Sequence, residues 1–210
     1  ESLYRDVGGV WMHMFFRDEV ILSAINYKPR DGDIFTVTYP KCGTNWMQCI
    51  IWNILTHGQP ASDIGEFSLM CPFIEMTGAG AAESHSRIGP VMTHLPLSVF
   101  RPVARAKYIY VARNPYDCAV SYYHFLKGLT PKTFTDISFE KFLSLFLSGK
   151  VIYGDFFDHL LPWYERRHDE NVLFVTYEQL KTDIRGEVLK IGNFLDKKYG
   201  DALRLDDALL

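Results

Sequence analysis

Residues 33–55 form the segment that most narrowly limits how this chain can fold. Residues 33–39 are rich in β-branched and aromatic side chains and lie between Gly32 and Pro40, which is typical of a buried strand. From Thr44 to Leu55 apolar residues recur at the spacing of a helix. Only the tight loop 41–43 separates the two elements. The sequence therefore predicts a strand–loop–helix unit here.

Two later segments repeat this order. Residues 106–112 predict a second strand, and Pro115 suits the first turn of the helix that follows it. Residues 171–177 predict a third strand, followed by a helix around residues 183–195. Strands that alternate with helices favour a central parallel β-sheet flanked by helices on both faces. We therefore expect an α/β fold in a single domain over residues 1–210.

Two further segments complete the expected architecture. Residues 78–82 contain only glycine and alanine, which indicates a small, mobile loop. Residues 139–167 carry many aromatic side chains and predict mostly helix.

The three predicted strands end at Lys41, Arg113 and Tyr177. Ligands of open parallel sheets bind beyond the carboxyl ends of the strands, so these side chains are expected to converge on one site. The helix that starts at Thr44 offers unpaired N–H groups to a phosphate, and Lys41 adds a cation. The loop matches neither GxxxxGK[ST] nor GxGxxG. From the residues alone, phosphate binding and a purely structural turn remain equally open.

Composition excludes several other classes of protein. The net charge of −3 provides no basic excess for nucleic-acid binding. The four cysteines form no CxxC pair, which argues against a zinc site and favours reduced thiols. The longest apolar segment, 47–55, is far shorter than the roughly 20 residues of a membrane span. With no export signal near residues 7–16, we expect a cytoplasmic protein that contacts neither nucleic acid nor membrane.

Several motifs together resemble those of the cytosolic sulfotransferases. Residues 39–46 (YPKCGTNW) are similar to that family's YPKSGTTW phosphosulfate loop, and residues 111–123 are similar to the segment containing its RNPKDVAVSYY motif. Residues 93–96 match the end of KTHLP, and residues 175–178 resemble FYED. Two shorter blocks, 72–75 and 149–154, also fit, and the likeness runs from about Trp11 onward. The resemblance implies sulfonate transfer from 3′-phosphoadenosine-5′-phosphosulfate (PAPS) to a hydroxyl group, with no metal.

The resemblance also assigns roles to individual residues. It implies a catalytic set of Lys41, His94 and Ser121, in which Lys41 stabilises charge on the leaving oxygen and His94 acts as the base. Arg113 and Ser121 would bind the 3′-phosphate, and Trp46 and Tyr177 would contact adenine. The implied donor-binding residues are Lys41, Cys42, Gly43, Thr44, Asn45, Trp46, Arg113, Ser121 and Tyr177.

The acceptor pocket is expected to be apolar. The expected lining residues are Phe73, Ile74, His94, Phe142, Val151 and Tyr153. Acceptors common in the family are phenols, catecholamine-like amines and, less often, steroids.

The chain departs from the family pattern at several positions. Cys42 and Asn45 stand in place of serine and threonine, and Cys42 at a helix N-terminus could be a reactive thiol. Met92 stands where the family usually has the lysine of KTHLP. The family's RKGxxGDW segment and its C-terminal dimerisation segment are not among the 210 residues, so we expect an incomplete donor site and a homodimer only in a longer form. A non-catalytic nucleotide binder and a P-loop-type nucleotide kinase are the alternatives.

Overall fold

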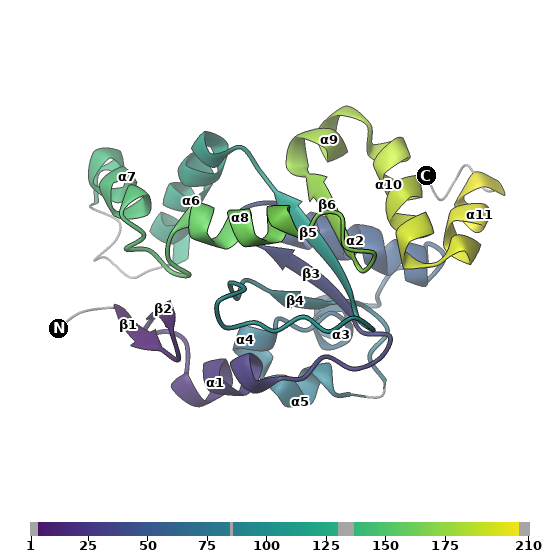
Figure 1. Cartoon of the computed structure of the whole chain (residues 1–210), viewed down its shortest axis with the longest axis horizontal. Helices are drawn as coiled ribbons and strands as arrows, with labels where there is room; N and C mark the ends of the chain where they lie inside the picture. The colour runs from purple at the N-terminus through teal and green to yellow at the C-terminus, as the bar shows by residue number, and fades with distance from the viewer. Residues whose placement is uncertain (1–3, 85, 130–136, 206–210) are drawn as a thin grey trace.

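The computed structural model describes residues 4–84, 86–129 and 137–205 and confirms the α/β fold. In this part of the chain four parallel strands form the central sheet in the order β4-β3-β5-β6 (Figure 1). These strands are β4 (Val91–Thr93), β3 (Ile34–Thr38), β5 (Lys107–Ala112) and β6 (Val172–Thr176). Val37 of β3 pairs with Thr93 of β4 and with Tyr110 of β5. This register brings the carboxyl ends of the strands to one edge.

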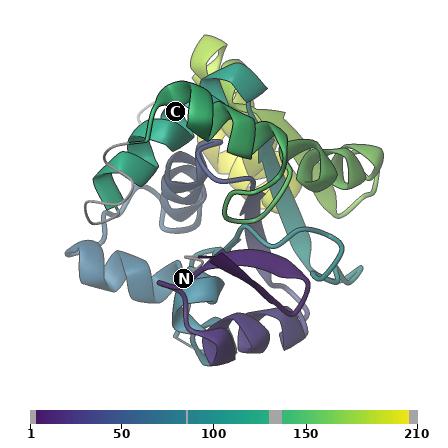
Figure 2. The same ribbon diagram turned by 90° about the vertical axis from the view of Figure 1, so that its left-hand side faces the viewer.

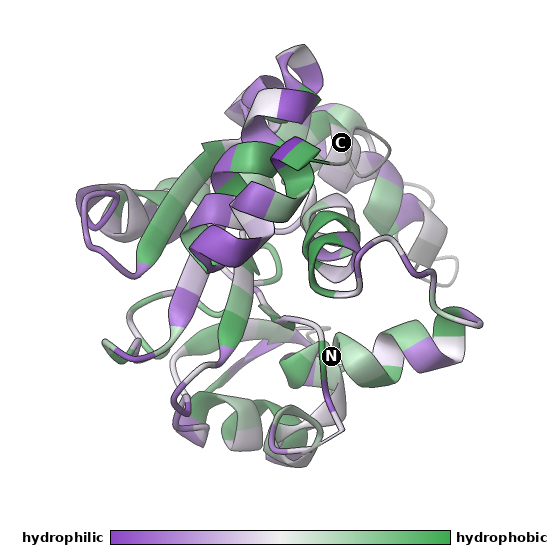
Figure 3. Ribbon diagram, turned by 90° about the vertical axis from the view of Figure 1, so that its right-hand side faces the viewer, coloured by the Kyte–Doolittle hydropathy of each residue, from purple (hydrophilic) through white to green (hydrophobic). Residues whose placement is uncertain are grey.

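Alternating side chains of the strands build a separate core on each face of the sheet. Phe35 and Tyr108 pack into the larger core, which involves α1 (Asp18–Asn26), α6 (Pro115–Leu129), α7 (Phe139–Leu147) and α8 (Phe156–Glu165). Ile109 and Val111 point to the opposite face. There they pack with α2 (Thr44–Leu55), α9 (Tyr177–Thr182), α10 (Ile184–Leu195) and α11 (Lys197–Leu205). Hydropathy colouring shows hydrophobic residues along the strands between these layers (Figure 3).

The predicted strands and helices around the sheet are found with small shifts in their ends. One difference matters for the site, because α9 begins at Tyr177, a residue predicted to end the third strand. Thr176 and Gln179 form a capping box that starts this helix directly after β6. The Tyr177 ring is therefore held by the first turn of a helix.

Residues 78–82 differ from the expected mobile loop. They follow α3 (Ile64–Met70) and α4 (Ile74–Thr77), and α5 (Ala79–Ala82) is itself a short helix. Gly78 makes the bend between α4 and α5 with a φ of 78°. The Ala79 N–H donates to Ser23 Oγ of α1 at 3.0 Å, and Ala82 is fully buried. Small side chains here permit close packing on α1.

An N-terminal hairpin was not predicted from the sequence. Strands β1 (Tyr4–Val7) and β2 (Val10–His13) pair in antiparallel fashion and lie beside α1 (Figure 2). The Trp11 carbonyl accepts a hydrogen bond from the Tyr153 N–H at 2.8 Å. The hairpin is thus joined to the connection between α7 and α8. Within the three described segments, none of the helices has the length and apolarity needed to cross a membrane.

Candidate active site

The loop between β3 and α2 makes a sharp left-handed turn. Lys41 has a φ of 70° and Gly43 a φ of 102°. A Cβ atom on Gly43 would lie 2.9 Å from Tyr177 Cδ2. Only glycine combines this backbone conformation with so close an approach of the tyrosine ring.

The N-terminus of α2 lacks the side-chain caps that begin several other helices. Gly43 provides no capping hydrogen bond, and the first turn contains no acidic residue. Side-chain caps are supplied elsewhere by Asp63, Ser138, Asp155, Thr176 and Asp183. The first N–H groups of α2 and the positive end of its dipole are therefore available to an anion.

Arg113, directly after β5, lies against this turn. Its Nη1 donates to the Lys41 carbonyl at 2.9 Å, and its guanidinium lies 4.4 Å above the Tyr177 ring. Its Nε is buried and has no hydrogen-bond partner in the described part of the chain. The Trp46 and Tyr177 rings meet edge to face, with centroids 5.4 Å apart. A cation with an unused donor beside two aromatic rings fits a nucleotide phosphate and base.

The Lys41 ammonium group occupies the same region. Its Nζ lies 4.3 Å above the centroid of the Phe125 ring. Partial burial lowers the pKa of Lys41, and the positive charge of Arg113 lowers it further. A bound anion would relieve this repulsion between two cations.

These groups line a cavity of about 260 Å³. Its lining residues are Pro40, Lys41, Gly43, Thr44, Asn45, Trp46, Met92, His94, Arg113, Ser121, Phe125 and Tyr177. The cavity brings together all of the predicted donor-binding residues except Cys42. Below, we call it the donor cavity.

The Cys42 side chain turns away from the donor cavity into the core. Its Sγ lies 3.8 Å from Cys118 Sγ, and both cysteines are free thiols. Burial raises the pKa of the Cys42 thiol well above its usual value. This contradicts the reactive thiol considered from the sequence, because desolvation outweighs the helix dipole at this position.

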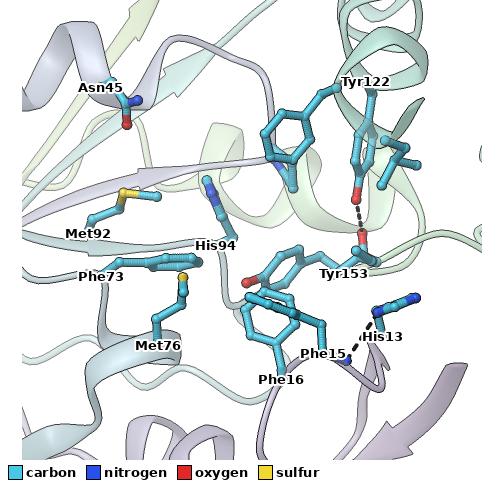
Figure 4. A pocket seen from close by; sticks show the side chains of 14 residues that line it. His13, Phe15, Phe16, Asn45, Phe73, Met76, Met92, His94, Tyr122 and Tyr153 are labelled. Atoms are coloured by element: carbon cyan, nitrogen blue, oxygen red, sulfur yellow. Dashed lines mark hydrogen bonds between the residues drawn. The ribbon is translucent and has the colours of Figure 1, made fainter. Parts of the chain in front are cut away.

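A second cavity of about 380 Å³, here called the acceptor cavity, lies beside the first and is mostly apolar. Its lining residues are His13, Phe15, Phe16, Pro40, Asn45, Phe73, Met76, Met92, His94, Tyr122, Phe125, Leu126, Ile152 and Tyr153. Figure 4 places Asn45, Met92 and His94 at one end of this cavity and His13 and Phe15 at the other. Phe15 is 68% exposed, so that end is open to solvent.

Three of the six predicted acceptor-pocket residues line the acceptor cavity: Phe73, His94 and Tyr153. The other three, Ile74, Phe142 and Val151, pack in the hydrophobic core. Sequence reasoning missed the contribution of the hairpin region, including His13, Phe15 and Phe16. The only signal in the sequence was the apolar character of residues 7–16.

The two cavities share a common wall. Five residues line both of them: Pro40, Asn45, Met92, His94 and Phe125. His94 follows the short edge strand β4, and β4 pairs with β3, which leads to Lys41. Parallel pairing of these strands therefore places an imidazole next to the turn before α2.

The hydrogen bonds of His94 define which ring nitrogen is free. Its Nδ1 lies 2.8 Å from the Thr38 carbonyl, which can only accept, so Nδ1 carries the proton. Nδ1 also lies 3.1 Å from Thr38 Oγ1, which is 2.7 Å from Thr44 Oγ1 in α2. Nε2 then keeps its lone pair. Burial lowers the pKa of His94 to about 4, which keeps the ring neutral at pH 7.

Metal chemistry has no candidate site within residues 4–84, 86–129 and 137–205. Among those residues, no group of three or more His, Cys, Asp or Glu side chains could hold a metal ion.

Comparisons with known proteins identify similar chains. The family model described as "Sulfotransferase domain" matches residues 31–207. The rat protein named sulfotransferase 2B1 is 39% identical over 194 residues, which cover 90% of this chain and 56% of the relative. The guinea-pig 3-alpha-hydroxysteroid sulfotransferase is 41% identical over 177 residues, covering 80% of this chain and 60% of the relative. The chain thus spans somewhat more than half the length of these curated relatives.

Solved structures show the same similarity. A mouse sulfotransferase, SULT7A1, crystallised in complex with PAP, is 32% identical with a TM-score of 0.74. That match covers 97% of this chain and 73% of the mouse chain. A retinol dehydratase in complex with retinol and PAP shares the fold at 23% identity, with a TM-score of 0.69 and coverage of 90% of this chain and 66% of that one.

Proposed function

The chain belongs to the sulfotransferase domain family, and from this premise we propose that it transfers a sulfonate group from PAPS to the hydroxyl group of a neutral, mainly apolar acceptor. The observation that carries the proposal is the shared wall. His94 lines both the cavity that contains Lys41 and Arg113 and the mostly apolar cavity beside it.

The donor cavity offers a group for each part of the nucleotide. Arg113 and Ser121 would hold the 3′-phosphate, while the N-terminus of α2 would hold the 5′-phosphate. Trp46 and Tyr177 would contact the adenine. Two features support this fit: the buried Nε of Arg113 has no partner among the described residues, and α2 is uncapped.

The transfer itself needs two protein groups. When bound, PAPS supplies the sulfonate group. His94 Nε2 accepts the proton of the acceptor hydroxyl while the hydroxyl oxygen bonds to sulfur. Lys41 stabilises the negative charge on the bridging oxygen, whose bond to sulfur breaks and which leaves with the 5′-phosphate.

The acceptor cavity favours neutral molecules over cations. None of the described residues that line it is acidic, and their polar groups include the imidazoles of His13 and His94 and the Asn45 amide. An ammonium group would lose its hydration there without gaining a counter-charge. The relative named for 3-alpha-hydroxysteroids supports an apolar alcohol, whereas a rabbit relative, 36% identical over 191 residues, is named an amine sulfotransferase.

A second candidate function is binding of the nucleotide without turnover. Met92 favours it, because this thioether occupies the shared wall at the position where a lysine was expected. Among the described residues, Lys41 is the only lysine that lines either cavity.

The test measures sulfonate transfer by the full-length protein to a phenol, a hydroxysteroid and a phenolic amine. We expect turnover of the two neutral acceptors to exceed that of the amine. His94→Ala should keep its affinity for adenosine 3′,5′-bisphosphate but lose roughly 10²- to 10⁴-fold in turnover, since a positioned base contributes that much. His168→Ala changes an exposed histidine and should leave turnover unchanged.

Other outcomes would each overturn part of the proposal. Tight binding of the bisphosphate with no turnover of any acceptor would favour the non-catalytic binder. Near-full turnover by His94→Ala would refute its role as base. Preference for ADP-Mg over the bisphosphate in calorimetric titrations would indicate a nucleotide kinase instead.

A further inference from the structure

Two buried side chains hold the backbone of His94 from opposite sides. The His94 N–H donates to Glu75 Oε1 at 2.6 Å. The His94 carbonyl lies 2.9 Å from His159 Nε2. Glu75 comes from α4 and His159 from α8, and both side chains are fully buried. Neither lines the donor or the acceptor cavity, so neither belongs to the reaction site described above.

The protonation of His159 follows from its partners. A carbonyl can only accept, so His159 Nε2 carries a proton and donates it to the His94 carbonyl. His159 Nδ1 must then accept from the Tyr110 hydroxyl, which lies 2.9 Å away. Burial lowers the pKa of His159 to about 3, so the ring stays neutral. A continuous chain of hydrogen bonds thus runs from Tyr110 in β5 to the base.

Glu75 accepts the hydrogen bond from the His94 N–H while its carboxyl group is mostly neutral. Burial raises its pKa to about 8, so the carboxyl group is mostly protonated at pH 7. A neutral carboxyl group still accepts the His94 N–H through its carbonyl oxygen. Its Oε2 and the Tyr153 hydroxyl are both buried without a hydrogen bond of normal geometry in the described residues. Maintaining such groups in a core is costly, and a core-filling role alone does not require them.

From this geometry we propose that Glu75 and His159 are positioning residues for sulfonate transfer, which hold the His94 backbone so that Nε2 faces the shared wall. With the Nδ1–Thr38 bond, three contacts fix the residue: one at its N–H, one at its carbonyl and one at its ring. Backbone and ring are then held together, which leaves the imidazole little freedom to tilt. This inference rests on the proposed role of His94 as the base.

Matched variants separate the hydrogen bonds from the volume of the side chains. Glu75→Gln keeps an oxygen that can accept the His94 N–H, whereas Glu75→Leu fills similar space without it. His159→Gln keeps a donor near the Nε2 position, and His159→Leu removes it. We expect the leucine variants to lose about tenfold to a hundredfold in kcat, because small misplacements of reacting groups cost that much. The glutamine variants should recover most of the loss.

Two readouts show that the fold and the donor site remain intact. Affinity for adenosine 3′,5′-bisphosphate and KM for the acceptor should change less than twofold in all four variants, so that the effect falls on kcat.

The nitrogen NMR shifts of the His94 ring should show a protonated Nδ1 in the wild type and a mixture of tautomers in Glu75→Leu. A leucine variant that lost bisphosphate affinity together with kcat would show a merely structural role and overturn the inference.

A double-mutant cycle with His94→Ala provides the sharpest test. If Glu75 and His159 act through the imidazole, adding Glu75→Leu or His159→Leu to His94→Ala should lower turnover no further. Independent, multiplicative losses would overturn the inference. The role of His94 as the base fails separately if His94→Ala alone keeps near-full turnover, and the proposed function fails if the wild type turns over no acceptor. A large loss in His94→Ala with no effect of the leucine variants refutes only the positioning role.

Discussion

Arg113 connects three parts of the donor cavity through one side chain. It donates to the carbonyl of Lys41 and stacks on Tyr177, and its buried Nε has no hydrogen-bond partner among the described residues. A lysine has a single ammonium group and cannot make these contacts at the same time. Loss of the hydrogen bond to the Lys41 carbonyl would also loosen the turn before α2.

Replacement of Arg113 by lysine should therefore weaken binding of adenosine 3′,5′-bisphosphate. We expect a loss of about tenfold to a hundredfold, as one charged hydrogen bond contributes roughly 1.5–3 kcal/mol. Calorimetric titration would measure it. Arg105→Lys is the matched control, because Arg105 is 79% exposed and pairs only with Asp31 among the described residues. Equal affinities of wild type and Arg113→Lys would contradict a phosphate-binding role.

At the scale of elements, the turn that starts α2 requires glycine at position 43, because a residue with a side chain would not fit there. Alanine at position 43 would force a strained left-handed backbone and push its Cβ against Tyr177. We expect Gly43→Ala to lose roughly 1–3 kcal/mol in free energy of unfolding and to weaken bisphosphate binding. Urea denaturation and titration would measure the two effects.

Gly32 provides the control for this prediction. It has a similar φ of 83°, but a Cβ there would meet nothing within 4 Å. Gly32→Ala should show the cost of backbone strain alone, with unchanged affinity for the bisphosphate. If both variants bound the bisphosphate equally well, contact between residue 43 and Tyr177 would not shape the donor cavity.

Elements with strong local patterns were predictable, and those set by distant contacts were not. The strand at 33–39 and the helix from Thr44 have clear periodicity and clear boundaries. By contrast, β4 has only three residues and exists through its pairing with β3. The helix α5 was mistaken for a loop because its glycine and alanines carry no apolar pattern; it is supported by packing on α1.

The same distinction applies to the site. Lys41, Arg113 and Tyr177 were expected to converge because parallel strands end at one edge, and they do line one cavity. The acceptor cavity also depends on Phe15 and Phe16, which follow a hairpin that contacts residues more than a hundred positions away. No local pattern encodes that long-range contact. The opposite error concerns three residues that were predicted to line the acceptor pocket but belong to the hydrophobic core: Ile74, Phe142 and Val151. Their apolar character alone does not distinguish a pocket lining from the core.

At the scale of the whole molecule, the buried groups around His94 link stability to pH. His94 and His159 have pKa values lowered from 6.5 to about 4 and about 3, so the unfolded chain binds more protons below pH 6.5. Their contribution to stability is complete above pH 6.5 and is lost as pH falls. Glu75 has a pKa raised from 4.5 to about 8, so its contribution is complete below pH 4.5 and is lost as pH rises towards 8.

Difference curves isolate these contributions from the rest of the protein. The free energy of unfolding of wild type minus that of Glu75→Gln should fall between pH 5 and pH 8. The same difference for His159→Gln should rise between pH 4 and pH 6.5. Chemical denaturation across this range would measure both. A flat difference curve for Glu75→Gln would mean that the carboxyl group ionises normally in the folded protein.

The wall between the two cavities has a thermodynamic consequence. A ligand bound in either cavity would contact the same five residues. Binding of one ligand would therefore change the surface that the other ligand contacts. Such an influence is reciprocal: if adenosine 3′,5′-bisphosphate changes the affinity for an acceptor by some factor, the acceptor changes the affinity for the bisphosphate by that same factor. Here the two cavities are neighbours, so this coupling requires no movement of distant elements. The same few side chains would then also decide how strongly spent nucleotide and fresh acceptor bind side by side.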